Sequence, residues 1–218
     1  MQHTFNLREL YSQQLNLRVA SLTGRRGITR GKAGDPPAHS GYKAGHRGFQ
    51  VSRRALRILL SMQVQHRIPP EEWILASSTQ GKPLVLGPEL GFHVSIAYAG
   101  SICGVATAQH RLVGIDLEPL PGQFDDDFPI YLLSEPETTL VHDCPTLFLR
   151  VWTLKEALAK EQGIGLIGDT DSLDTSSYAR SPPGRLIDRP DGGTAFHCHF
   201  CIGKHRYALA LMQGPLLL

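Results

Sequence analysis

Two short groups of charged residues carry the chemistry that this sequence suggests. Trp152, Glu156 and Lys160 follow one another at intervals of four, which places them on one face of a helix. Asp116 and Glu118 are two residues apart after an apolar stretch, so they share one face of a predicted strand. Two carboxylates this close repel each other unless a cation or a donor lies between them, and magnesium takes such oxygen ligands. The alternative for each group is a solvated surface, as a helical Glu–Lys pair or as acids on a sheet edge.

A helix must present the first group. The segment 151–166 reads VWTLKEALAKEQGIGL, and its apolar positions recur at helical spacing. That stripe consists of Leu147, Val151, Leu154 and Leu158. Asp143 is expected to cap the start of the helix, and Gly163 and Gly165 are expected to end it.

Composition limits the classes of protein that need consideration. The chain has 218 residues, of which 41% are hydrophobic and 19% charged, as in ordinary folded proteins. The net charge of +2 favours neither a nucleic acid nor a membrane surface as partner. Apolar runs stay well short of the roughly 18 residues of a membrane span. The N-terminus lacks the apolar core of a secretory signal, so we expect a cytoplasmic protein. We also expect a monomer.

The remaining pattern predicts a mixed α and β chain. One further helix is expected at 51–65, and strands are expected at 15–23, within 73–85, and at 92–100, 102–108 and 112–120. A proline-rich, acidic connector at about 117–130 divides the chain into halves, 1–115 and 116–218. The segment 24–48 holds seven glycines and six Lys or Arg residues, which fits either a solvated linker or a basic flap over an anionic ligand.

The stretch HCHFCIGKH near the C-terminus allows two interpretations. Cys198 and Cys201 form a Cys-x-x-Cys pair among histidines, which raises the possibility of a zinc site. A structural zinc site usually needs a second ligand pair, and His142 and Cys144 could supply it only through a coincidence of folding. We favour a strand followed by a turn at 203–204, with reduced cysteines, because apolar residues alternate along the stretch.

Four motifs together resemble the phosphopantetheinyl transferases. They are GKP at 81–83, FHVS at 92–95, VGIDLE at 113–118 and WTLKEALAKEQGIGL at 152–166, in the order and spacing of that family. The size and the two halves look like the surfactin-synthetase type, a single-chain pseudo-dimer. The resemblance implies an α+β fold of two similar lobes related by a pseudo-twofold axis, each a helix packed on a small antiparallel sheet. It also implies transfer of the 4′-phosphopantetheine arm of coenzyme A to a serine of an apo acyl or peptidyl carrier protein, with release of adenosine 3′,5′-bisphosphate.

The resemblance also assigns roles. Asp116, Glu118 and Glu156 would bind Mg²⁺, with Glu156 as candidate base and Lys160 at the diphosphate and the leaving phosphate. Lys82 and Ser95 would lie along the phosphates of coenzyme A, and Lys155 would support the phosphates. Either Arg47 or Arg53 would contact the adenosine end. Glu137 matches a further carboxylate of the family that follows the connector.

One block departs from the family pattern. Where the family commonly has Phe-Asn-x-Ser-His-Ser, this chain has Ile96 at the histidine that contacts the 3′-phosphate and His93 at the asparagine. His93 shares a strand face with Ser95 and could substitute. The departure leaves a second hypothesis, a non-catalytic relative that binds coenzyme A or a carrier protein, although such a protein has no need of the acidic set.

Overall fold

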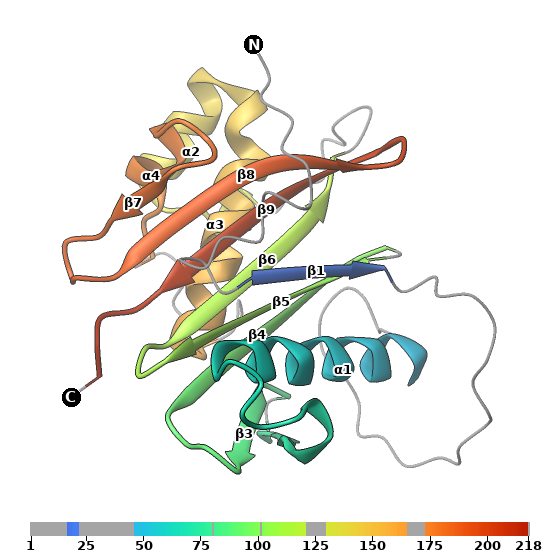
Figure 1. Ribbon diagram of the computed structural model, residues 1–218. Helices are drawn as coiled ribbons and strands as arrows, with labels where there is room; N and C mark the ends of the chain where they lie inside the picture. The colour runs from blue at the N-terminus through green and yellow to red at the C-terminus, as the bar shows by residue number, and fades with distance from the viewer. Residues whose placement is uncertain are drawn as a thin grey trace.

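Two antiparallel sheets, each covered by a helix, form the centre of the protein. The computed structural model describes residues 17–21, 46–79, 81–100, 102–120, 130–164 and 173–217. Figure 1 shows α1 (His46–Gln63) in front of the first sheet and α3 (Phe148–Gln162) behind the second. The architecture is therefore α+β, with a long helix packed on a small antiparallel sheet in each half of the chain.

The first sheet has the strand order β1-β5-β4. Its members are β1 (Leu17–Ser21), β4 (Phe92–Ala99) and β5 (Ile102–Gln109), and the last two form a hairpin. Leucines at helical spacing on α1, such as Leu56 and Leu60, pack on Phe92 and Val94 of β4. The apolar stripe of α1 and one face of β4 therefore form a small core of their own.

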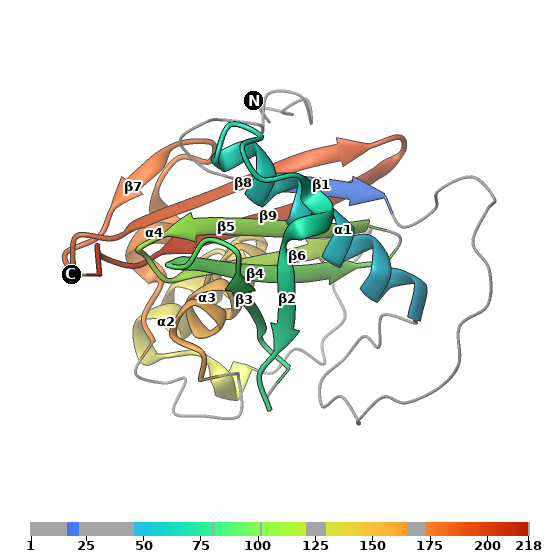
Figure 2. The same ribbon diagram turned by 60° about the horizontal axis from the view of Figure 1, so that its bottom comes forward.

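A two-stranded ribbon, β2 (Ile74–Ser77) and β3 (Pro83–Gly87), runs across the direction of the other strands (Figure 2). A short 3-10 helix (Pro70–Glu72) precedes it. Arg53 of α1 holds the ribbon, because its guanidinium donates to the carbonyl of Ala76 at 2.9 Å and to the hydroxyl of Ser77 at 2.6 Å.

The second sheet has the order β6-β9-β8-β7. Its strands are β6 (Val113–Pro119), β7 (Leu186–Asp188), β8 (Thr194–Ile202) and β9 (His205–Gln213). Helix α3 covers one face, together with α2 (Glu135–Asp143) and α4 (Ser176–Arg180). Further 3-10 turns lie at Ile130–Leu132 and Pro145–Leu147.

The two sheets pack face to face between the helices. Side chains of β4 and β5 meet those of β6, β8 and β9 in the largest shared core, which includes Ile115, Leu117 and Phe200. Ser95 crosses this contact, since its hydroxyl accepts a hydrogen bond from the amide of Ile115 at 3.1 Å. The two halves of the chain therefore share one apolar interior.

Most expected elements are present, and three boundaries differ. Asp143 does not cap α3, because it is the last residue of α2, and Leu147 at the start of α3 makes no side-chain capping bond. Strand β6 continues to Pro119, so the start of the expected connector is strand. The basic segment 24–48 lies outside the described residues up to position 45, and α1 begins at His46.

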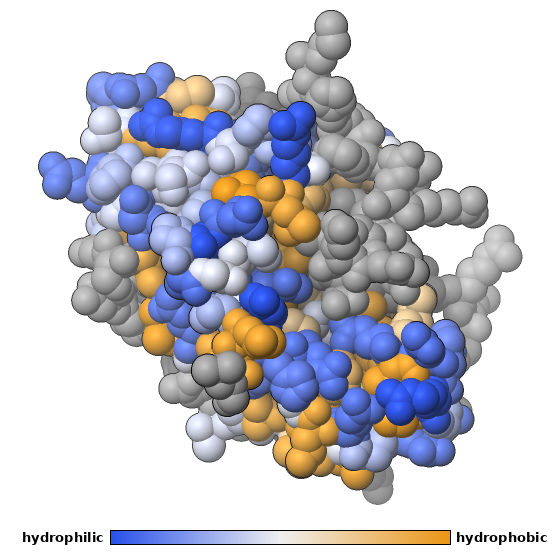
Figure 3. Space-filling view, turned by 60° about the vertical axis from the view of Figure 1, so that its left-hand side comes forward, coloured by the Kyte–Doolittle hydropathy of each residue, from blue (hydrophilic) through white to orange (hydrophobic). Residues whose placement is uncertain are grey.

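None of the helices among the described residues is long and apolar enough to cross a membrane. On the face shown in Figure 3, apolar side chains form separate groups between polar ones. Large apolar side chains that are exposed include Ile74 and Leu86 of the ribbon.

Gly114 sets the distance between α3 and β6. A Cβ atom at this position would lie 1.9 Å from the carbonyl oxygen of Ala157 and 2.4 Å from the amide nitrogen of Glu161. Both contacts are to helix backbone, which cannot rotate away as a side chain could. Only glycine therefore lets the helix lie this close to the strand.

We expect Gly114→Ala to lower the free energy of unfolding by about 1–3 kcal/mol or more, because the added methyl forces α3 away from β6. Urea denaturation measures the change. Gly87→Ala is the matched control, because a Cβ there meets no atom within 4 Å. Equal stability of the two variants would contradict the close packing described here.

Candidate active site

Strand β6 and helix α3 bring the two predicted charged groups together. The Lys160 ammonium donates to Asp116 Oδ1 at 2.5 Å, so a residue of the helix pairs with a residue of the strand 44 positions earlier. Asp116 is only 4% exposed, and its other oxygen, Oδ2, is buried with no hydrogen-bond partner among the described residues. Burial alone would lower the pKa of Lys160, but the carboxylates of Asp116, Glu156 and Glu118 raise it above its usual value.

Glu118 and Glu156 complete the acidic group. Burial raises the pKa of Glu118 to about 7, with further upward effects from Asp116 and Glu156, while Lys160 and a hydrogen bond from Trp152 oppose the rise. The pKa of Glu156 is also raised to about 7, first by burial and then by Asp116, against the opposing effect of Lys160. Carboxyls with pKa values near neutrality in a shared site are a frequent mark of function.

The donor set fits a hard divalent cation. Three carboxylates supply oxygen ligands of the kind that magnesium takes, and Asp116 Oδ2 is a buried acceptor that no described group uses. As the side chains stand, no three His, Cys, Asp or Glu residues in the described part of the chain converge closely enough to hold a metal. Lys160, rather than a third carboxylate, occupies the near side of Asp116.

The C-terminal end of α3 contacts the other half of the chain. Lys82, in the turn between β2 and β3, donates to the carbonyls of Lys160 and Glu161 at 2.9 and 3.1 Å. Carbonyls at this end of a helix lack partners within it and carry partial negative charge, so they favour a cation. Gly163 then ends the helix in a left-handed conformation with φ of 76°. Lys82 and Lys160 therefore belong to one region, as the motifs predict.

Arg189 is a charged residue beside this region that the sequence did not single out. Its guanidinium forms a very short buried pair with Glu161 and a second pair with Asp191 at 2.6 Å. Glu161 follows Lys160 directly, so this ion pair fixes the last turn of α3 against the second sheet. Arg189 lies just after β7, a strand that sequence periodicity did not predict.

His93 and Ile96 lie on opposite faces of β4. Burial lowers the pKa of His93, and the nearby charges of Lys82 and His110 lower it further, which places this imidazole close to Lys82. Ile96 packs against the core of the first half, beside residues of α1. Of the two positions that depart from the family block, His93 is the one near the candidate site.

Other expected ligand contacts are occupied by interactions within the protein. Ser95 is buried and bound to the Ile115 amide, while Arg53 is buried and bound to the ribbon. Arg47 stands at the second position of α1. The structure thus brings Asp116, Glu118, Glu156 and Lys160 together and places Lys82 at the end of the same helix. Ser95 and Arg53 instead make contacts between elements of the fold.

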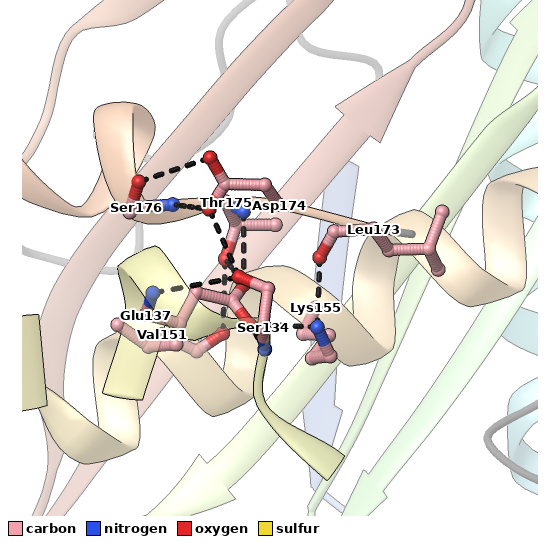
Figure 4. Close-up of polar contacts among 8 residues, drawn as sticks. All are labelled: Ser134, Glu137, Val151, Lys155, Leu173, Asp174, Thr175 and Ser176. Atoms are coloured by element: carbon pink, nitrogen blue, oxygen red, sulfur yellow. Dashed lines mark hydrogen bonds and ion pairs between the residues drawn. The ribbon is translucent and has the colours of Figure 1, made fainter. Parts of the chain in front are cut away.

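Lys155 lies in a buried polar network on another face of α3. Its ammonium donates to Glu137 Oε2 at 2.6 Å and to the carbonyl of Leu173 at 2.7 Å, and both side chains of the ion pair are fully buried (Figure 4). Glu137 also accepts from the Ser134 amide and from the amide and hydroxyl of Thr175. All four contacts to the carboxylate come from the chain itself, so this network joins α2, α3 and the start of α4.

The β8–β9 hairpin confirms the strand interpretation of the Cys-x-x-Cys stretch. The chain turns at 203–204, as expected, and Cys198 is buried in the contact between the sheets. Cys198 and Cys201 are three apart on one strand, so their side chains leave opposite faces. Cys198 and Cys201 are free thiols, and no metal-binding group of three is found among the described residues.

Comparison with known proteins agrees with this geometry. Residues 112–212 match the 4′-phosphopantetheinyl transferase superfamily. The match covers just under half of the chain and includes β6 and α3 with Asp116, Glu118, Glu156 and Lys160. It supports the superfamily, and with it a phosphopantetheinyl transferase activity in general terms. No curated protein matches the chain.

We expect Lys155→Met to destabilise the fold by about 3–5 kcal/mol, because it leaves the Glu137 carboxylate buried without its counter-charge. Urea denaturation measures the loss, and exposed Lys204→Met is the matched control. A change as small as that of the control would mean that the network contributes little to stability.

We expect the acidic group to make the metal-free protein less stable as the pH rises from 5 to 8. Between about pH 4.5 and 7 the folded protein holds protons on Glu118 and Glu156 that the unfolded chain has released, so this contribution falls as pH increases. The buried His197, whose pKa is lowered to about 4, acts in the opposite direction below about pH 6.5, so the wild type is compared with Glu156→Gln. Thermal melts in the presence of a chelator measure both slopes. The stability of Glu156→Gln should fall less, or rise more, with pH than that of the wild type, and identical slopes would contradict the shared acidic site.

Proposed function

We propose that this protein transfers the 4′-phosphopantetheine group of coenzyme A to a serine of an apo carrier protein and releases adenosine 3′,5′-bisphosphate. The observation that carries the proposal is the meeting of Asp116, Glu118, Glu156 and Lys160 between β6 and α3. These residues lie within the segment that matches the superfamily. Phosphoryl transfer depends chiefly on positioning and on neutralising charge, which is what such a group can do.

The three carboxylates are the proposed holders of Mg²⁺. Asp116 supplies a buried, unused oxygen, and Glu118 and Glu156 add partly exposed ones. When bound, Mg²⁺ neutralises charge on the diphosphate of coenzyme A and orients it. The rigid spacing of β6 and α3, fixed at Gly114, holds the ligands from the two elements at a constant separation.

Glu156 is the proposed general base. In the metal-free protein burial raises the pKa of Glu156 to about 7, and a bound cation would lower it, so that the carboxylate is ionised before it takes the proton. The serine hydroxyl gives its proton to Glu156, and the serine oxygen bonds to the phosphorus on the pantetheine side of the diphosphate. The bond from that phosphorus to the bridging oxygen breaks, and the electron pair leaves on the bisphosphate.

Lys160 and Lys82 are the proposed cationic contacts. Lys160 is within reach of the departing phosphate if it turns away from Asp116, and its charge stabilises the leaving oxygen. Lys82 lies beside the same helix end and would follow the phosphates of coenzyme A, with His93 next to it. Ser95, Lys155, Arg47 and Arg53 remain predicted ligand contacts of the family type. Ser95, Lys155 and Arg53 would have to exchange internal bonds to serve.

The seam between the two halves is the proposed coenzyme A site. Lys82 comes from the first half and Glu156 and Lys160 come from the second, as in a single-chain pseudo-dimer of the surfactin-synthetase type. We place the division of the halves at β6, near residues 115 and 116. Acyl and peptidyl carrier proteins are both candidate acceptors.

A non-catalytic relative is the second candidate. The observation that favours it is Ile96, which packs in an apolar cluster where the family has a histidine for the 3′-phosphate. Binding alone gives no reason for three carboxylates and a lysine in one partly buried group, and we therefore favour the enzyme.

We expect Glu156→Gln to reduce transfer about a thousandfold or more, and Asp116→Asn to act similarly, because each removes an anionic ligand that stabilises the transition state. The measurement is the mass increase of apo acyl and peptidyl carrier proteins with coenzyme A and magnesium, followed over time. Raised magnesium should restore Asp116→Asn in part and Glu156→Gln less, since Glu156 is also the base.

Exposed Glu72→Gln is the matched control and should leave the rate unchanged. Circular dichroism establishes that the variants are folded. Turnover of Glu156→Gln at more than a tenth of the wild-type rate would exclude the proposed mechanism, and wild-type protein that binds coenzyme A without transfer would favour the non-catalytic relative.

A further inference from the structure

Lys160 provides the positive charge that the buried Asp116 carboxylate needs before any ligand binds. Asp116 is anchored in the middle of β6 and almost fully buried, whereas the Lys160 side chain is 32% exposed and reaches Asp116 from the last turn of α3. A buried carboxylate without a counter-charge is strongly unfavourable. The Lys160 ammonium supplies that charge in the metal-free protein.

Contacts on both sides hold the backbone around Lys160, while its long side chain has other rotamers available. Lys82 binds the Lys160 carbonyl, and the Arg189–Glu161 pair fixes the next residue, so the last turn of α3 has contacts on both sides. The four-carbon stem of lysine can nevertheless swing its ammonium through several ångströms by changing rotamers. Lys160 can therefore leave Asp116 without any change in the fold.

A divalent cation on the unused Asp116 Oδ2 would lie only a few ångströms from an ammonium that stayed on Oδ1. Like charges a few ångströms apart repel strongly in a partly buried site. The carboxylates do not converge on one point as they stand, and Lys160 is the group that lies against Asp116. Cation binding must therefore include displacement of Lys160.

We propose that Lys160 is a tethered counter-ion, which occupies the cation position beside Asp116 in the metal-free protein and moves outward when a divalent cation replaces it. The proposal rests on the proposed function, because it takes the same carboxylates as the ligands. It adds a second role for Lys160, since displacement leaves the ammonium free at the edge of the site, where a phosphate of the substrate is expected. The cost of displacing Lys160 lowers the affinity of the free protein for metal.

Metal binding by variants of the full chain tests the proposal, without coenzyme A or carrier protein. The probes are Mn²⁺, followed by its electron paramagnetic resonance signal, and Mg²⁺, followed by calorimetry. Lys160→Met should bind either cation at least tenfold more tightly than the wild type, because the competing charge is gone. Lys160→Arg, which keeps the charge, and the remote control Lys204→Met should stay within about twofold of the wild type.

Thermal melts supply a second measurement. Without metal, Lys160→Met should melt at a lower temperature than the wild type, since Asp116 has lost its partner. Saturating Mn²⁺ should raise its melting temperature by more than it raises that of the wild type. Should Lys160→Met fail to fold, Lys160→Gln keeps a hydrogen-bond donor without the charge and should show the same tighter binding.

Equal or weaker metal binding by the folded variants overturns the proposal, and so does a failure of both wild type and variants to bind metal. The carrier-protein mass assay reports separately on the proposed function. Tighter binding by Lys160→Met together with no transfer by the wild type would support the counter-ion and reject the transferase. Transfer by the wild type with unchanged metal binding in the variant would do the reverse.

Discussion

Contact between the backbone of α3 and Gly114 is the constraint on which the candidate site depends. The helix approaches β6 so closely that a single methyl group would overlap its carbonyl and amide atoms. This spacing places the Lys160 ammonium 2.5 Å from Asp116 Oδ1. It also brings Glu118 and Glu156 close enough to interact electrostatically with each other and with this pair. The acidic group is therefore a product of packing between two elements, and neither element forms it alone.

Helix α3 carries two lysines with opposite surroundings. Lys155 and Glu137 are fully buried, and each has further hydrogen bonds from the chain (Figure 4), so the pair is complete and serves the fold. Lys160 and Asp116 are less enclosed, and Asp116 keeps one buried oxygen unused. Each charged atom of the Lys155–Glu137 pair has a hydrogen-bond partner, whereas Asp116 has an oxygen left for a ligand. This difference distinguishes the structural ion pair from the candidate functional one on the same helix.

Sequence patterns predicted the parts of this protein that depend on local spacing. The i, i+4 face of α3, the alternation of β4 and the hairpin of β8 and β9 follow from periods of 3.6 and 2, and the structure contains all three. The role of Lys155 could not be found this way, because its partner Glu137 belongs to another helix. One signal was available, since Ser134 and Glu137 form a capping box whose spacing marks the start of α2. Arg189 gave no signal, because its bond to Glu161 exists only after the sheet has formed.

The contact of Lys82 with the end of α3 has a consequence for how the two halves can diverge. The first half reaches this helix end through an ammonium on a turn, and a turn residue depends little on the strands behind it. Strand β6 and helix α3 must keep a glycine, three carboxylates and a lysine in fixed register. The positional requirements of the candidate site therefore fall more heavily on β6 and α3 than on the strands before them. The family match begins at residue 112, where this more constrained part of the chain begins.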